Sequence, residues 1–186
     1  MVDEVPRCRR FLCVAGGRAQ AGALGRTLGL SSEWRIETQR GADLGARMRN
    51  AIADCFRAGC EKVILTGTDT PWMGRRRLEL ALHALDRTDV VLGPARDGGY
   101  YLVGARCGLR DAVPDIFTDV AWGTRHVLRQ TMAKLRRARV PYRLLARDFD
   151  LDRPEDLSRA RTLLRRNPRR AKTLSRWIED WRNAIS

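Results

Sequence analysis

The sequence lacks any long hydrophobic run. Across its 186 residues no window approaches the roughly 18 uninterrupted apolar residues that a membrane-spanning helix requires. Residues 1–6 also lack the pattern of a secretory signal peptide, in which an apolar segment follows basic residues. We therefore expect a soluble, cytoplasmic protein without a membrane span.

Cysteine pairs of the C-x-x-C type are missing as well. The five cysteines are Cys8, Cys13, Cys55, Cys60 and Cys107, an odd number without the spacing of a zinc knuckle. This pattern argues against a disulfide framework of the kind found in small secreted proteins. We expect the thiols to be reduced and to fill space as small apolar side chains.

Acidic residues are in deficit. The chain has 36 Lys and Arg against 22 Asp and Glu, a formal net charge of +14 at pH 7, and almost all of the positive charge is arginine. Such a balance favours anionic partners, which include nucleic acid, an anionic membrane surface and a phosphate-bearing substrate. Composition does not choose among them, and an arginine bias along the whole chain is equally expected from a GC-rich coding sequence.

What the sequence contains is an alternation of short apolar runs with longer stretches of helical period. This alternation is typical of a βαβ protein with buried, mostly parallel strands, and 186 residues suffice for one such domain. The strands are predicted at residues 11–15, 34–38, 62–66, 90–93, 100–104 and 142–146. The predicted fold class is α/β, with a twisted, mostly parallel sheet flanked by helices.

Helices are predicted from the spacing of apolar residues. Asp43 is the expected N-cap of a helix whose buried face consists of Leu44, Met48, Ile52, Cys55 and Phe56. A second helix, beginning near Gly123, has a face made of Val127, Leu128, Thr131 and Leu135. A third is expected after Pro154, where Glu155 and Asp156 suit the positive end of the helix dipole.

Residues 167–186 are predicted to form a basic amphipathic helix that follows a domain of residues 1–166. Its apolar residues at helical spacing are Leu174, Trp177, Ile178, Trp181 and Ile185. Such a helix can lie on a membrane surface or bind nucleic acid. More often it packs on its own domain or on a second subunit, so a homodimer is one expected arrangement.

The first segment that points to chemistry is T-G-T-D-T-P, residues 66–71, directly after an apolar run. In open α/β sheets, ligands bind at the carboxyl ends of strands. There, Asp69 would be held on a rigid element, while Gly67 permits close backbone approach and Pro71 ends the strand. The alternative is that Asp69 only caps the helix that follows.

The second segment is G-P-A-R-D-G-G-Y-Y, residues 93–101, in which two glycines follow Asp97 and lead into a strand. An Asp-Gly pair is also among the strongest signals of a β-hairpin turn. Taken alone, this segment predicts a hairpin more readily than a binding site.

The third segment is D-F-D-L-D-R-P, residues 148–154. Alternate carboxylates, those of Asp148, Asp150 and Asp152, project to one side of an extended strand end. Like charges this close repel one another unless a cation lies among them. Magnesium is the natural candidate, because it binds one or two carboxylates and completes its octahedron with water and phosphate oxygens.

These strings, in this order, resemble the small GT-A-fold glycosyltransferase-like family of the arsenosugar-biosynthesis type, within the nucleotide-diphospho-sugar transferase superfamily. The matching strings are T-G-T-D-T-P, G-P-A-R-D-G-G-Y-Y-L-V-G and D-L-D-R-P-E-D-L. Residues 39–48 and Trp122-Gly123-Thr124 match as well, so the resemblance spans roughly residues 11–157. Five ordered motifs are specific for the fold and much less so for the substrate.

The resemblance implies a Rossmann-like GT-A sandwich with a site for Mg²⁺ or Mn²⁺. Asp69 takes the place of the family's metal-binding carboxylate, and Asp150 and Asp152 converge on it from the last strand. Asp69 and Asp97 are the implied catalytic residues. The implied substrate-binding residues are Asp43, Arg47, Thr68, Asp97, Gly98, Gly99, Tyr100, Trp122 and Thr124.

A protein of this kind would transfer a sugar from a nucleoside diphosphate sugar to an unknown small-molecule acceptor. Two alternatives stay open. One is a nucleotidyltransferase, because the family is similar to the 2-phospho-L-lactate guanylyltransferases and the molybdenum-cofactor nucleotidyltransferases. The other is a catalytically inactive homologue that binds an anionic partner such as nucleic acid. The family's first strand and nucleotide loop precede the part that corresponds to residues 11–28, so we expect this chain to be N-terminally shortened.

Overall fold

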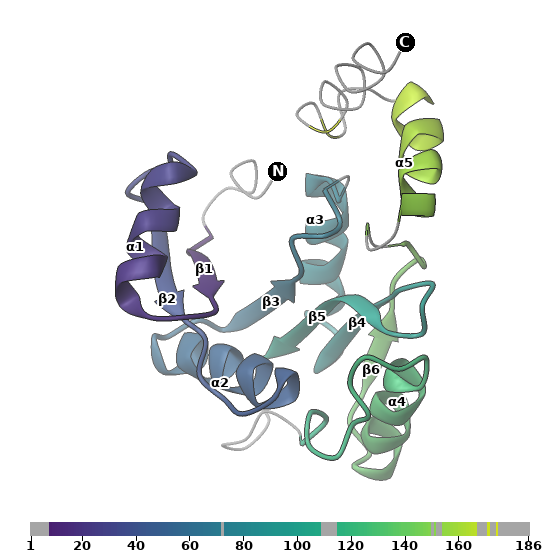
Figure 1. The fold of residues 1–186 in the computed structure, drawn as a ribbon. Coiled ribbons are helices and arrows are strands. Elements are labelled where there is room, and N and C mark those ends of the chain that lie inside the picture. The colour runs from purple at the N-terminus through teal and green to yellow at the C-terminus, as the bar shows by residue number, and fades with distance from the viewer. Residues whose placement is uncertain are drawn as a thin grey trace.

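The computed structural model describes residues 8–71, 73–108, 115–149, 151, 154–166, 171 and 174. Within them the chain forms six strands and five helices (Figure 1). The strands are β1 (Arg10–Val14), β2 (Trp34–Thr38), β3 (Lys62–Thr66), β4 (Val90–Pro94), β5 (Tyr100–Arg106) and β6 (Tyr142–Leu144). The helices are α1 (Arg18–Thr27), α2 (Leu44–Arg57), α3 (Arg75–Ala84), α4 (Val127–Arg137) and α5 (Pro154–Arg166). The α/β class is confirmed, and all the predicted strands are present.

The described strands form two sheets. β1 and β2 pair in parallel, from Arg10 opposite Trp34 to Val14 opposite Thr38. The larger sheet has the strand order β3-β5-β4-β6. In it, β4 and β6 are parallel, whereas β5 runs antiparallel to both β3 and β4. The larger sheet is therefore mixed, with β5 reversed among strands that share one direction.

The reversal of β5 follows from the turn that precedes it. The N–H of Ala95 donates to the carbonyl of Gly99 at 3.0 Å, which closes a tight connection between β4 and β5. Gly98 in this turn has a φ of +97°, which glycine adopts without the steric cost of a Cβ. A parallel pair would need a much longer crossover. The hairpin interpretation of the Asp97-Gly98 pair is thus confirmed.

Helices cover both faces of the larger sheet. One core cluster contains Ile52 of α2, Leu135 of α4 and Leu92 of β4. The second contains Leu78 of α3 and Val91 of β4. Because successive strand residues point to opposite faces, α2 and α4 lie on one face of the sheet and α3 on the other.

α2 begins and ends with well-formed caps. The Oδ1 atom of Asp43 accepts the N–H of Ala46 at 2.7 Å, which confirms Asp43 as the N-cap. At the other end, Gly59 has a φ of +82° and the N–H of Cys60 donates to the carbonyl of Cys55 at 3.0 Å. This is a Schellman motif, and it turns the chain directly into β3.

Two details of the helix predictions are wrong. Leu44, expected on the buried face of α2, is 49% exposed, because the adjacent Gly45 faces the core in the first turn. The helix expected near Gly123 begins at Val127. There the hydroxyl of Thr124 donates to the carbonyl of Ala121 at 2.7 Å and holds the preceding residues in turns.

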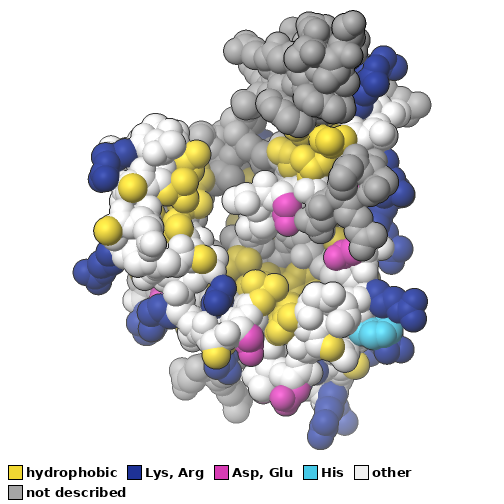
Figure 2. All heavy atoms as spheres, viewed as in Figure 1, with side chains coloured by type: hydrophobic (Ala, Val, Ile, Leu, Met, Phe, Trp, Pro, Cys, Tyr) yellow, Lys and Arg dark blue, Asp and Glu magenta, His cyan; other side chains and the backbone are white. Residues whose placement is uncertain are grey.

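On the face shown in Figure 2, Lys and Arg side chains lie mostly along the left, right and lower margins. None of the described helices is both long enough and apolar enough to cross a membrane. All five cysteines are free thiols. The predicted helix of residues 167–186 lies outside the described residues, apart from residues 171 and 174.

Candidate functional site

Three loops lie at one edge of the larger sheet. β3 ends at Thr66, β4 at Pro94 and β6 at Leu144, and these strands run in the same direction. The loops that follow them contain the three segments selected from the sequence. The structure therefore gathers these segments at the rim where open α/β sheets bind ligands.

Asp69 lies in an exposed loop directly after β3, next to the exposed Thr68. Its Oδ1 atom is 3.5 Å from the hydroxyl of Thr70, and no cationic side chain of the described residues pairs with it. A Cβ on Gly67 would lie 2.4 Å from this Oδ1 atom, so glycine leaves the space that the carboxylate occupies. The carboxylate is therefore open to solvent and held at the end of a strand.

The loop after β6 is joined to the Asp69 loop through the main chain. The N–H of Leu151 donates to the carbonyl of Asp69 at 2.8 Å. Leu151 separates Asp150 from Asp152, the other two predicted metal ligands, and both of these lie outside the described residues. Across the described part of the chain, no three His, Cys, Asp or Glu side chains are grouped to hold a metal ion. The metal site stays a prediction.

Asp148 does not belong to an uncompensated cluster of carboxylates. It forms an ion pair with Arg77 of α3, and the two side chains are 9% and 19% exposed. Its Oδ1 atom also accepts the N–H of Phe149 at 3.0 Å. The sequence argument that three neighbouring carboxylates need a cation is therefore wrong for Asp148, because a guanidinium from a distant helix neutralises it.

Arg77 is a positioning residue that sequence reasoning missed. Its guanidinium lies 5.1 Å from the centre of the Tyr101 ring, a cation–π contact. The hydroxyl of Tyr101 donates to the carbonyl of Ala146 at 3.0 Å, and the N–H of Asp148 donates to Pro94 at 3.0 Å. These contacts fix the segment that leads to Leu151. No feature of the sequence distinguishes Arg77 from the two arginines that precede it.

Asp97 has both a structural bond and a free oxygen. Its Oδ1 atom accepts the N–H of Gly99 at 2.8 Å, which stabilises the hairpin turn. The side chain is exposed, and its Oδ2 atom has no partner within the described residues. A Cβ on Gly98 would lie 2.3 Å from the carbonyl oxygen of Arg125, so the turn packs directly against the start of α4. A substrate-binding role for this turn stays a prediction.

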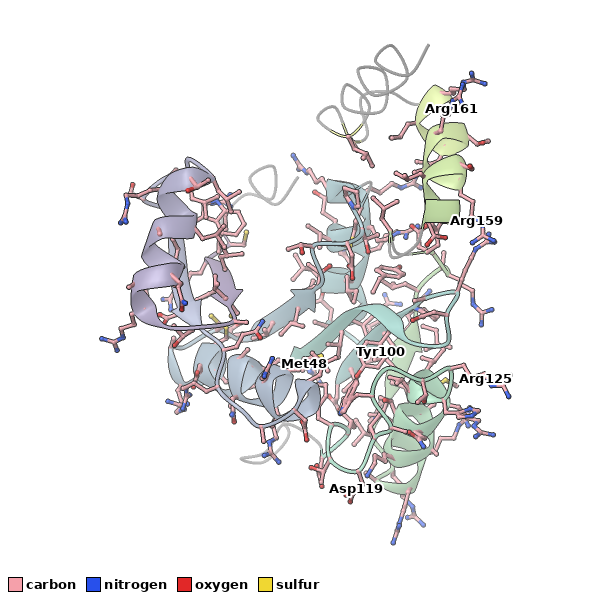
Figure 3. The ribbon with its side chains drawn as sticks, in the orientation of Figure 1. Met48, Tyr100, Asp119, Arg125, Arg159 and Arg161 are labelled. Atoms are coloured by element: carbon pink, nitrogen blue, oxygen red, sulfur yellow. The ribbon has the colours of Figure 1, made fainter. Side chains whose placement is uncertain are left out.

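Tyr100 points away from the rim, into the space between the sheet and α4 (Figure 3). Its ring packs edge-on against Trp122, with the ring centres 6.2 Å apart. Burial raises the pKa of Tyr100 far above its ordinary value. The hydroxyls of Tyr100 and Thr131 are both buried without a hydrogen bond of normal geometry. The structure thus places Tyr100 in the packing beneath α4.

The start of α2 packs against the loop before α4. A Cβ on Gly45 would lie 2.6 Å from the Nε1 atom of Trp122, and Trp122 stacks on Phe117 with ring centres 6.4 Å apart. Asp43 caps the helix, and the Nε atom of Arg47 donates to the carbonyl of Gly41 at 3.2 Å. The predicted substrate-binding residues of this region thus have structural contacts, and their binding role stays a prediction.

Comparison with known proteins agrees with this architecture. Residues 1–124 match the family model described as "Uncharacterized protein conserved in bacteria (DUF2064)". No curated protein matches the chain. A crystal structure from Desulfovibrio desulfuricans G20, described as a "putative nucleotide-diphospho-sugar transferase", is 30% identical, with a TM-score of 0.77. That match covers 90% of this chain and 75% of the other. The chain belongs to the bacterial DUF2064 family and has the fold of the nucleotide-diphospho-sugar transferases.

Proposed function

We propose that this protein is a metal-dependent transferase that moves a sugar from a nucleoside diphosphate sugar to a small-molecule acceptor. The observation that carries the proposal is the 2.8 Å hydrogen bond from Leu151 to Asp69, which joins the two loops that contain the predicted metal ligands. The 30% identical structure, through its described class, supports a nucleotide sugar as the donor.

The described part of the site fits a hard divalent cation. Asp69 offers carboxylate oxygens, the ligands that Mg²⁺ and Mn²⁺ prefer, without a cationic partner among the described residues. Asp150 and Asp152 would supply the remaining protein ligands. A bound cation would neutralise charge that develops on the diphosphate leaving group.

The side chains at the rim would position the two substrates. The Arg77–Asp148 ion pair holds the β6 loop against α3, and the link from Leu151 joins it to the β3 loop. On the acceptor side, the bond from the Gly99 N–H fixes Oδ1 of Asp97. The exposed Oδ2 atom would then accept the proton of an acceptor hydroxyl.

The test is to incubate the full chain with a panel of nucleoside diphosphate sugars and Mn²⁺ or Mg²⁺. Slow hydrolysis, with water in place of the acceptor, should release nucleoside diphosphate. The Asp69→Asn variant should lose roughly a hundredfold or more of this rate, the scale of one lost electrostatic contact in a transition state. Asp119→Asn is the matched control, because Asp119 is exposed and asparagine tolerates its φ of 49°.

The products separate the alternatives. Release of pyrophosphate from nucleoside triphosphates would instead indicate a nucleotidyltransferase. The proposal is wrong if no nucleotide sugar yields product and none raises the melting temperature in the presence of metal, because ligand binding to the native state always raises it.

A further inference from the structure

A pocket with a volume of about 280 Å³ lies between α4 and the rim of the larger sheet. Four arginines line it: Arg125, Arg129 and Arg136 from α4 and the turn before it, and Arg147 from the segment after β6. Figure 3 shows Arg125 beside α4, directed outward. Figure 2 shows Lys and Arg side chains gathered on the same side of the molecule. Nothing in the spacing of these arginines along the sequence predicts the cluster.

These four guanidinium groups have no carboxylate partner within the described residues. Among the described residues, the polar contact of Arg129 is with the Nδ1 atom of His126, at 3.4 Å. Elsewhere, Arg40, Arg77 and Arg106 each pair with an aspartate. Four positive charges around one pocket repel one another, and an anion among them relieves that repulsion. Guanidinium groups also match phosphate oxygens with two parallel hydrogen bonds.

The α4 wall of the pocket is fixed by main-chain contacts. The N–H of Leu128 donates to the carbonyl of Gly98 at 2.9 Å. A Cβ on Gly98 would lie 2.3 Å from the carbonyl oxygen of Arg125, so the helix start rests directly on the hairpin turn. Because Gly98 has no side chain, the backbone of Arg125 can approach the turn this closely.

The opposite wall is fixed to the same hairpin. Arg147 immediately precedes Asp148, whose N–H donates to the carbonyl of Pro94 at 3.0 Å and which forms a parallel bridge with Ala95. The arginines therefore come from two separate elements that are both anchored to the β4–β5 turn. A solvated face of a single helix would not have this arrangement.

The lining and size of the pocket favour a small ligand. Leu128 and Met132, both half-buried, contribute apolar surface between the arginines. A volume of about 280 Å³ is near the lower end of the range of small-molecule sites. It suits one phosphate group with a short organic portion.

We propose that this pocket binds the phosphate group of a small phosphorylated ligand, held by Arg125, Arg129, Arg136 and Arg147. Asp97 directly precedes Gly98, so a ligand in the pocket would extend toward the side of the rim where the acceptor is expected. The identification of this ligand with the acceptor rests on the proposed function. The binding of a phosphate group in the pocket is independent of that function.

The experiment is calorimetric titration of the full chain with pyrophosphate and with inorganic phosphate, in EDTA so that no metal contributes. The pocket variant is Arg129→Gln, Arg136→Gln, Arg147→Gln, in which all three changed positions are exposed. The matched control is Arg26→Gln, Arg35→Gln, Arg87→Gln, which removes the same charge from exposed positions elsewhere. A third protein, Asp69→Asn, tests independence from the proposed metal site.

We expect the pocket variant to bind pyrophosphate roughly a hundredfold more weakly than the parent, since charge-assisted hydrogen bonds are lost. The control and Asp69→Asn should bind as the parent does, even if no transferase activity is found. Equal weakening in the pocket variant and the control would overturn the proposal, because it would indicate diffuse surface attraction. Absence of pyrophosphate binding to the parent would also overturn the proposal. Displacement of pyrophosphate by a single-stranded oligonucleotide, with a steep salt dependence, would overturn it as well, because it would assign the surface to nucleic acid.

Discussion

The main-chain N–H of Leu151 donates a hydrogen bond to the carbonyl of Asp69 at 2.8 Å, although the two residues are far apart in the sequence. A backbone bond of this kind fixes the separation of two loops whatever their side chains do. The residues on either side of Leu151 are aspartates. The bond therefore holds the main chain of Leu151 beside the loop of Asp69.

Magnesium should stabilise the parent protein. At a concentration about a hundred times its dissociation constant, binding adds about 2.7 kcal/mol to the free energy of unfolding, which raises the melting temperature by roughly 5–10 °C. The Asp69→Asn variant and the Asp150→Asn, Asp152→Asn variant should show little or no rise, whereas Asp119→Asn should respond fully. Thermal denaturation with and without Mg²⁺ is the measurement. Equal responses in all four proteins would contradict the metal site.

Gly67→Ala should displace the Asp69 carboxylate. The added methyl would lie 2.4 Å from Oδ1, closer than any real contact, and the side chain must move to relieve the clash. Metal affinity should fall about tenfold or more, with a smaller effect on stability. The control is Gly22→Ala, whose Cβ would meet only the end of the Arg26 side chain, at 3.6 Å. Titration of both variants with Mn²⁺ checks this, and unchanged affinity in Gly67→Ala would refute it.

Arg77→Met should destabilise the fold by about 2–4 kcal/mol, because it leaves the buried carboxylate of Asp148 without its counter-ion. Adding Asp148→Asn should restore part of that loss. The control is Arg75→Met, since Arg75 pairs with Glu79 on the exposed face of the same helix, where about 0.5 kcal/mol or less is expected. Denaturant unfolding measures each value. Similar losses of unfolding free energy in Arg77→Met and Arg75→Met would contradict a larger contribution of the Arg77–Asp148 pair.

Cys55 should be the least reactive thiol at neutral pH. Burial, followed by the neighbouring thiols Cys60 and Cys13, raises the pKa of Cys55 to about 11. On the order of 0.1% of it is then thiolate at pH 8, the form that reacts. Mass spectrometry after alkylation should show Cys107, which is exposed, labelled first. Labelling of Cys55 should accelerate about tenfold per pH unit from 8 to 10.

The same shift has a consequence for stability. Because the unfolded thiol ionises at lower pH than the folded one, its contribution to stability is fully present below about pH 9 and is lost as the pH rises through about 11. Rapid labelling of Cys55 at pH 8 in the folded protein would contradict both statements.

Local sequence pattern was enough to locate most elements. The apolar run before Thr66, ended by Gly67 and Pro71, predicts β3 and the loop of Asp69, and both are found. The cap at Asp43 is likewise encoded within three residues of itself. Where the information is local, the physical reason for a structure can be read from the sequence.

Features that depend on distant partners could not be predicted in this way. The Asp97-Gly98 turn signal indicates that β5 pairs with β4, but no local pattern shows that β3 is its other neighbour. The face that Tyr100 takes follows a register irregularity between Gly93 and Pro94. In the sequence, Arg77 and Arg147 do not differ from the other arginines. The fold pairs Arg77 with Asp148 and places Arg147 at a pocket.

The division of the strands between two sheets has a consequence for hydrogen exchange. Within the described residues no ladder of hydrogen bonds connects β1 or β2 to the larger sheet, and β1 is mostly half-buried whereas β4 is fully buried. α1 packs closely on β2, since a Cβ on Gly25 would lie 2.0 Å from the Cδ1 atom of Ile36. The β1–α1–β2 unit can therefore open without disturbing the β4–β5 hairpin. The amides of this unit should exchange through such partial opening, whereas the amides of β4 and β5 should exchange only on global unfolding.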